Sequence, residues 1–335
     1  FNYAKQTVKL AIEFDHPKNK LLAWLQLADI YSKKADYRSS LEYGNKSKAL
    51  ALALDMDKEY AESLILIGGS ISKLGDYEKS AALNFQALAI FEKIGDHKGI
   101  SEAFNRIGYD YFVQGFHDKA LEYYTQTLKI SREIKELEGI SRGLNNVAIV
   151  YADKGESLFA KAYFKESIEI NKLIDKPSWV GINYLNLGTV YRIEEKYDTA
   201  FYYLKRSVQI MTRLNNRQKL PDSYYGLSMY YRDFGKPDSS LYYAKLSYQL
   251  GMENKQKNKV FNGAKLLSEL YEQQDDFENA FTYSKIESQL KDSLATEMSM
   301  ARISHLELLY EYDKTEQENK IAQQRREYIL ILVGA

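Results

Sequence analysis

A pattern of residues recurs along this chain at a constant spacing of 40 residues. The pattern is a large, an aliphatic, a small and an aromatic residue at helical spacing, first as Trp24, Leu27, Ala28 and Tyr31. Two copies depart from it at one position each, with Ile71 at the aromatic position and Ala264 at the large one. The small residue recurs without insertion at Ala28, Gly68, Gly108, Ala148, Gly188, Ser228 and Ser268. A fixed period over so many copies requires a fold that stacks one unit, since a single unit buries too little apolar surface.

A second helical pattern follows the first in every copy. A turn such as Gly75-Asp76 or Gly115-Phe116 comes first, and glycine there suits the left-handed conformation that often ends a helix. A small residue follows each turn, and an apolar residue, usually Tyr, stands three positions later. These small residues are Ser40, Ser80, Ala120, Ala160, Ala200, Ser240 and Ala280. Each unit is therefore predicted to be a helix, a turn and an antiparallel helix, and the chain to be all-α.

The repeats also account for the high tyrosine content. The chain contains 29 Tyr, and 13 of them fall in two columns of the repeat, those of Tyr31 and Tyr43. We expect both columns to be buried beside the small residues, where aromatic rings fill the space between helices.

On these residues the chain resembles the tetratricopeptide repeat (TPR) family, in a 40-residue form rather than the common form of about 34 residues. The resemblance implies a right-handed α-α superhelix, the TPR solenoid, over residues 1–290. A half repeat at 1–20 precedes seven full repeats, because Tyr3 stands 40 residues before Tyr43. The proline that usually closes the unit is absent, so the second helix is expected to run longer before the link. Units of this length are similar to those of regulatory, peptide-binding members.

The C-terminal part differs from the repeats. No Gly or Pro stands between Phe277 and Val333, so a long helix is expected there. Residues 291–327 are predicted to be a polar linker or capping helix, through which a homodimer could form. Residues 328–335 (YILILVGA) are too short to cross a bilayer, which needs about 20 residues, but they fit the start of a transmembrane helix.

The array and this tail together resemble the sensor region of membrane-anchored bacterial signalling regulators, whose output is a histidine kinase or a DNA-binding domain. That resemblance implies a location on the periplasmic side of the inner membrane, with an anchor after residue 327. Arg325-Arg326 favours the alternative, because basic residues concentrate on the cytoplasmic side. The alternative is a soluble cytoplasmic scaffold or peptide-receptor regulator.

Composition argues against several kinds of chemistry. The chain has no Cys and only 4 His, which are widely spread, so no metal-ligand spacing exists. No phosphate-binding loop or zinc-protease motif is present. The 46 basic and 46 acidic residues balance, which disfavours nucleic acid as a partner of this region. We therefore predict a protein that is not an enzyme and has no cofactor, metal or catalytic residue.

The resemblance implies that the first helices of the repeats line a concave groove that binds a peptide or protein. Positions that contact ligands in the family correspond here to Asn105, Tyr109, Phe112, Arg142, Asn145, Leu185, Thr189, Arg192, Tyr225, Met229 and Arg232. We expect these side chains to be free of the stacking core. Asn105 and Asn145 have amides suited to a peptide backbone. Arg192 and Arg232 are suited to a carboxylate.

Overall fold

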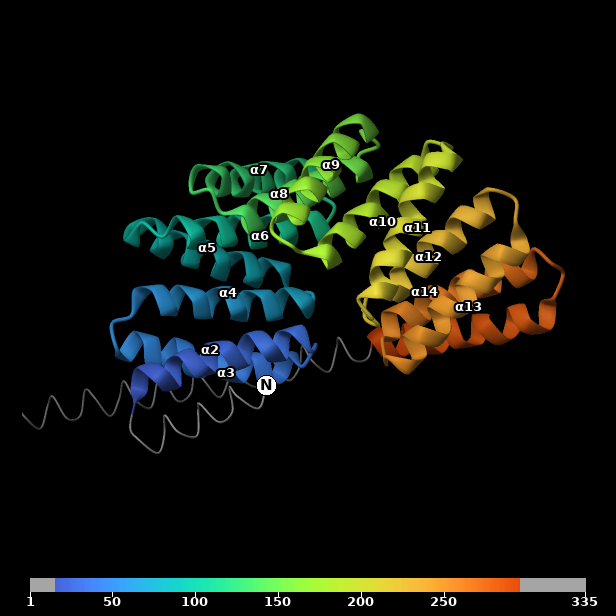
Figure 1. Ribbon diagram of the computed structural model, residues 1–335. Helices are drawn as coiled ribbons and strands as arrows, with labels where there is room; N and C mark the ends of the chain where they lie inside the picture. The colour runs from blue at the N-terminus through green and yellow to red at the C-terminus, as the bar shows by residue number, and fades with distance from the viewer. Residues whose placement is uncertain (1–15, 296–335) are drawn as a thin grey trace, which may run out of the picture. The chain divides into compact units, whose positions relative to one another are not determined.

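The computed structural model describes residues 16–295, which form α-helices joined by short links (Figure 1). They divide into two compact units, 16–87 and 88–295. The first contains α2 (Pro17–Lys33), α3 (Tyr37–Ala53), α4 (Asp57–Lys73) and most of α5 (Tyr77–Ile94). The second contains α6 (His97–Val113), α7 (His117–Glu133), α8 (Leu137–Asp153), α9 (Ser157–Leu173), α10 (Pro177–Ile193), α11 (Tyr197–Arg213), α12 (Leu220–Asp233), α13 (Pro237–Glu253) and α14 (Lys257–Glu272). The predicted all-α solenoid of stacked hairpins is confirmed.

The chain is helical again from 277 to 295, where the described residues end. Nearly all of the predicted linker at 291–327, the expected homodimer contact and the apolar run at 328–335 lie outside the described residues. The first part of the half repeat, residues 1–15, also lies outside them.

Every helix-to-helix link between residues 16 and 295 contains one residue with a positive φ angle, and these residues are 20 apart. They are Ala35, Asp55, Gly75, Gly95, Gly115, Lys135, Gly155, Asp175, Glu195, Asn215, Gly235, Lys255 and Asp275. At Gly115 the N–H donates to the Phe112 carbonyl at 2.9 Å, and the next N–H, of Phe116, donates to the Tyr111 carbonyl at 3.0 Å. This is the Schellman pattern, which satisfies the last carbonyls of a helix.

The length of the repeat is shared between its two helices. Both helices of the α6–α7 and α8–α9 hairpins have 17 residues, so the first and second helices of a repeat are equally long. In these two hairpins the left-handed residue, Gly115 or Gly155, is the middle one of a three-residue link between the helices. The shorter α12, with 14 residues, begins at Leu220, because residues 217–219 form a turn before it.

The small residues of both patterns lie where the two helices of a hairpin meet. A Cβ atom on Gly68 would lie 3.3 Å from the Ser80 carbonyl oxygen of the next helix. In a later repeat the Ser228 hydroxyl donates to the Ser240 carbonyl at 2.8 Å. The small columns therefore allow close approach of two helix backbones, as predicted.

The two tyrosine columns form one stacked pair in each of six repeats rather than a buried row. The pairs are Tyr31–Tyr43, Tyr111–Tyr123, Tyr151–Tyr163, Tyr191–Tyr203, Tyr231–Tyr243 and Tyr271–Tyr283, with ring centroids 5.5–5.7 Å apart. The rings are parallel and offset, a favourable aromatic geometry. Most of these rings are half-buried, so the expectation of full burial is wrong.

The fully buried column stands one position later in the second helix. Tyr124, Phe164 and Leu204 are 2%, 1% and 0% exposed. Each faces the small residue of the preceding helix: a Cβ on Gly108 would touch the Tyr124 ring, and one on Gly188 would touch Leu204. Large residues in this column thus fill the space that the small residues leave open.

In the unit 88–295 the first helices of successive hairpins contact one another, as α6 with α8, α8 with α10, α10 with α12, and α12 with α14. Among the described helices, α7, α9, α11 and α13 make no such contacts with each other. The first helices are therefore closer together, and the surface formed by α6, α8, α10, α12 and α14 is called the inner face below.

Candidate functional site

The predicted site residues form two groups on the inner face. One group lies on α6 and α8, and consists of Asn105, Tyr109, Phe112, Arg142 and Asn145. The other lies on α10 and α12, and consists of Leu185, Thr189, Arg192, Tyr225, Met229 and Arg232. Five members of the second group line an open pocket.

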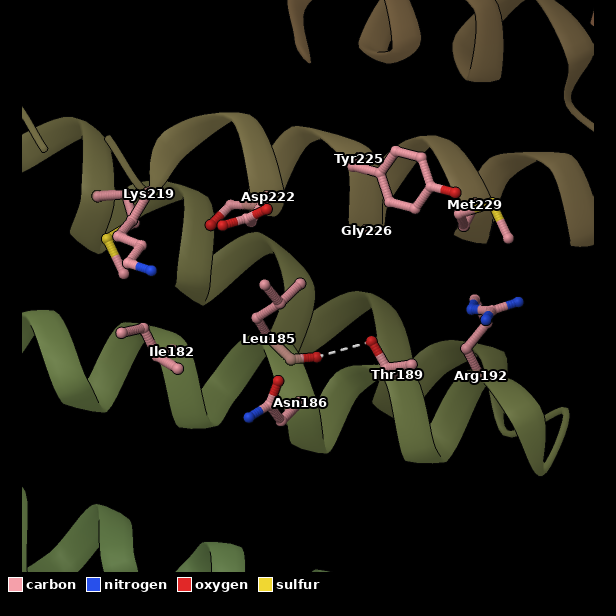
Figure 2. A pocket seen from close by; sticks show the side chains of 12 residues that line it. Ile182, Leu185, Asn186, Thr189, Arg192, Lys219, Asp222, Tyr225, Gly226 and Met229 are labelled. Carbon is pink, nitrogen blue, oxygen red and sulfur yellow. Dashed lines mark hydrogen bonds between the residues drawn. The ribbon is translucent and has the colours of Figure 1, made fainter. Parts of the chain in front are cut away.

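This pocket has a volume of about 350 Å³ and opens between α10 and α12 (Figure 2). Five of the predicted residues line it: Leu185, Thr189, Arg192, Tyr225 and Met229. Figure 2 shows the two helices side by side, with Lys219 at one end of the pocket and Arg192 at the other. A pocket of this size is at the lower end of the range of small-ligand sites and suits one or two side chains of a peptide.

The middle of the pocket is mainly apolar. Leu185 and Met229 are partly buried and pack against the cores of neighbouring hairpins. The Thr189 hydroxyl donates to the Leu185 carbonyl at 3.0 Å within its own helix, so its methyl group is left to contact a ligand. Burial raises the pKa of the Tyr225 phenol, which stays protonated at neutral pH and can donate a hydrogen bond.

At the Arg192 end the charges are already paired within the chain. Arg192 forms an ion pair with Asp233. Arg232 contacts Asp233 at 3.2 Å and Glu269 at 3.4 Å. A ligand carboxylate would have to compete with these two acids for Arg192 and Arg232.

At the opposite end a cation has no acidic partner. Among residues 16–295, no carboxylate lies within ion-pair distance of the Lys219 ammonium, whereas Asp222 of the same pocket pairs with Lys259. A negatively charged group on a ligand would therefore find its uncompensated partner at Lys219 rather than at Arg192.

The predicted asparagines are buried, contrary to the expectation that they stand free of the core. Asn105 is 9% exposed and Asn145 is 5% exposed. Both contact Asn146: the Asn146 amide donates to Asn105 Oδ1 at 2.8 Å, and the Asn145 amide donates to Asn146 Oδ1 at 3.2 Å. The three amides form one row across α6 and α8, and Asn146 is its more accessible member.

Arg142, Tyr109 and Phe112 are also engaged within the protein. Arg142 pairs with Glu102. Tyr109 and Phe112 are half-buried against the core of the α6–α8 region. Phe112 also meets the His117 ring edge-on, with centroids 5.8 Å apart. The α6–α8 group is therefore a packed surface with few groups open to a ligand.

The α10–α12 pocket contains residues that the sequence analysis did not select. They are Asn186, Met211, Lys219, Ser223 and Gly226. Gly226 can be recognised as unusual from the sequence, because the same repeat position holds Asn186, Asn146 and Arg106 in other repeats. A Cβ on Gly226 would lie 2.5 Å from Leu185 Cδ1, so glycine there makes room for the leucine.

The ion pairs that Glu102 forms with Arg106 and Arg142 lead to a prediction about its pKa. Burial would raise the pKa of Glu102, but the Arg106 and Arg142 guanidinium groups outweigh it and hold the pKa below its usual range. A depressed carboxyl pKa stabilises the fold above the unfolded value of about 4.3, and this stabilisation is lost as the pH falls through the folded pKa. In Arg142→Ala, an NMR titration of the carboxyl groups should show a higher pKa for Glu102. Glu194 is the control, because its pKa is lowered mainly by Lys161; equal shifts of both would contradict the assignment.

The described residues contain no group of three or more His, Asp or Glu side chains placed to hold a metal ion. Within 16–295 we also find no helix whose length and apolar character would let it span a bilayer.

A family model described as a tetratricopeptide repeat matches residues 99–172 and 180–251. A comparison with curated proteins finds no match.

Several solved structures share the fold. The crystal structure of BtubC (BKLC) from P. vanneervenii is 21% identical, with a TM-score of 0.55, and the match covers 70% of this chain and 93% of that one. A Rap protein complexed with competence and sporulation factor is 18% identical, with a TM-score of 0.67 and coverage of 83% and 76%. The Rap conjugation gene regulator of the plasmid pLS20, in complex with the Phr* peptide, is 18% identical, with a TM-score of 0.65 and coverage of 85% and 78%. At these identities the similarity shows the fold alone.

Proposed function

The chain belongs to the tetratricopeptide repeat family, and we propose that its inner face binds an extended peptide segment of a protein partner. The observation that carries the proposal is the pocket between α10 and α12, which is lined by five of the predicted contact residues. An array of this kind acts through the surface that its stacked helices expose, and that surface is generally used for protein interaction rather than catalysis.

The pocket has the features of a side-chain anchor site. Its apolar middle, between Leu185 and Met229, suits an aliphatic or aromatic side chain of the peptide. Tyr225 supplies a phenol that can donate to a backbone carbonyl, and Lys219 supplies a positive charge that has no ion-pair partner among residues 16–295. We therefore expect a peptide with an apolar residue next to an acidic one.

The amide row on α6 and α8 extends the proposed path. Asn146 is its accessible member, and Asn105 and Asn145 hold the Asn146 amide in place by hydrogen bonds. Axes of packed helices are about 8–10 Å apart, so the path from α6 to α12 is about 24–30 Å long. An extended segment of about eight or nine residues spans that distance.

Two of the structures of similar fold are complexes with a peptide or a factor: a Rap protein with competence and sporulation factor, and the pLS20 Rap regulator with the Phr* peptide. These ligands belong to those proteins. They support the class of ligand proposed here, and not its sequence.

The proposal is tested by filling the pocket. A nine-residue peptide is first selected against the full chain from a random library. In Thr189→Trp the indole should occupy the pocket and weaken binding of that peptide by roughly tenfold or more, as for loss of an anchor contact. Titration calorimetry or fluorescence anisotropy measures the change.

The matched control is Thr212→Trp, which places the same side chain at an exposed position of α11. It should leave the affinity unchanged. If Thr189→Trp and Thr212→Trp bind the peptide equally well, the α10–α12 pocket is not the anchor site.

The double variant Asn105→Ala, Asn145→Ala tests the amide row in the same assay, and unchanged affinity would remove that row from the path.

We further propose that the array is the sensor region of a membrane-anchored bacterial regulator. The supporting feature is in the sequence, where the polar stretch 311–327 is followed by the apolar run 328–335. Fractionation of cells that express the complete gene product tests this idea: recovery with the inner membrane and cleavage of the array by external protease in spheroplasts are expected. Recovery in the cytoplasmic fraction would favour the alternative, a cytoplasmic peptide-receptor regulator.

A further inference from the structure

A second pocket, of about 410 Å³, lies away from the inner-face site and is formed by α9, α10 and α11. One stripe of α11 supplies five of its residues, at spacings of three and four: Tyr202, Arg206, Gln209, Ile210 and Arg213. Lys172 from α9 and Val180 and Tyr184 from α10 complete it. None of these residues belongs to the peptide site proposed above.

The charges of this pocket are all positive. Lys172, Arg206 and Arg213 line it, and no acidic residue does. Lys172 reaches Glu169 of its own helix at 2.7 Å. In the described part of the chain, neither Arg206 nor Arg213 has a carboxylate within ion-pair distance, and the Arg206 guanidinium lies over the Tyr202 ring at 5.5 Å. The pocket therefore holds two uncompensated guanidinium groups in a protein of zero net charge.

The preceding repeat does not carry the same charges at the corresponding positions. The positions 40 residues before Lys172 and Arg206 hold Arg132 and Glu166, which form an ion pair at 2.5 Å. In the α9–α11 pocket the acidic member is replaced by Arg206, so two cations line the same groove. Arg213 adds a third where the preceding repeat has Leu173. Like charges in one groove repel unless an anion lies between them.

The walls of the pocket are apolar and partly aromatic. Val180 is buried, Ile210 and Tyr184 are half-buried, and Tyr202 is exposed with the Arg206 guanidinium over its ring. Rings in this arrangement provide flat surfaces for a planar apolar group. The pocket thus combines a cationic side with a surface suited to a flat body.

We propose that this pocket binds a small phosphomonoester that carries a flat apolar group. A phosphate monoester has a charge of about −1.5 to −2 at neutral pH, which matches two unpaired guanidinium groups, whereas a carboxylate has only one charge. Guanidinium groups also bind phosphate oxygens through paired N–H donors. The flat group lies against Tyr184 or Tyr202, and the Gln209 amide is placed to bond polar atoms at its edge.

The test uses phenyl phosphate as the probe, with the full-length chain and titration monitored by calorimetry and NMR. We expect saturable binding of phenyl phosphate that is tighter than binding of inorganic phosphate, benzoate or phenol. Adenosine 5′-monophosphate is titrated in parallel, and its affinity relative to phenyl phosphate tells whether a nucleotide or a simple aryl phosphate is the better source of the group.

Two exposed arginines are then changed, so folding is not at risk. Arg206→Gln and Arg213→Gln should each weaken phenyl phosphate binding by roughly tenfold, the usual effect of losing a charged hydrogen bond. Lys205→Gln is the matched control, because Lys205 lies on the same helix over the Phe201 ring and outside the pocket. Absence of saturable binding, benzoate binding as tightly as phenyl phosphate, or an equal loss in Lys205→Gln would each overturn the proposal.

Discussion

Replacing Phe164 by alanine is expected to lower the free energy of unfolding by about 3–5 kcal/mol. Phe164 is 1% exposed and lies in a cluster with Ala148, Ile168, Val180 and Leu187. The substitution removes a buried ring from the point where α8, α9 and α10 meet. The neighbours are held by the backbones of three helices and can close the cavity only in part, so both the transfer and the cavity terms contribute.

Phe159→Ala is the matched control, since Phe159 is on the same helix but is 50% exposed. It should cost about 1 kcal/mol or less, because only the stacking with Tyr151 is lost. Stacked repeats can unfold in parts, so denaturation followed by circular dichroism is combined with hydrogen exchange in α8, α9 and α10. If the two variants lose the same stability, the packing described for the buried column is wrong.

The repeat period made most of the fold predictable. Residues such as Gly188 and Ala200 recur as small side chains at fixed positions, and this marks where helices meet, because any larger residue would push the backbones apart. The links were only half predictable. Gly115 and Gly155 signal the turn inside a hairpin, but Lys135 and Lys255 adopt the same positive φ between hairpins with no residue-type signal. Their conformation is imposed by the packing of the helices on either side.

The buried column was missed for a related reason. Tyr123, Tyr163 and Tyr203 repeat the same residue and so stand out, but they stack at the hairpin edge. The column that fills the core changes from Tyr124 to Phe164, since each residue is matched in size to its own neighbours. A residue type that recurs along the repeats thus indicated a recurring contact. Burial of a side chain depended instead on the volume available among its own neighbours.

The sequence was enough to predict which surface carries the candidate site, but not which charged groups on that surface are already paired within the protein. Leu185, Tyr225 and Met229, which the family register gives as contact positions, line one pocket. It could not show that Arg192 is paired, because the partner Asp233 is 41 residues away and reaches it from the next repeat. Lys219 was missed because it lies in the turn before α12, outside the helical register.

Replacing Gly188 by leucine is expected to destabilise the protein by about 3 kcal/mol, at the upper end of the cost of overpacking a core. A Cβ atom at this position would lie 2.7 Å from Leu204 Cγ and 3.1 Å from the Leu204 backbone nitrogen. Leu204 is fully buried, so its side chain has no free space to move into. Relief would require separation of α10 from α11, and this separation would disturb the stacked Tyr191–Tyr203 pair as well.

Smaller substitutions test whether the close approach of the two helices, rather than any change at Gly188, causes the loss of stability. Gly188→Ala adds one methyl group and gains up to about 1 kcal/mol of helix propensity, so its net cost should be much smaller than that of leucine. Leu204→Ala alone should lower the stability of the protein. Adding Gly188→Ala to it should restore part of that stability, because the added methyl group fills some of the space that the leucine leaves. Such coupling is measured as a double-mutant cycle from the four unfolding free energies. Strict additivity, or a leucine variant as stable as the parent chain, would mean that the small column does not set the distance between the helices.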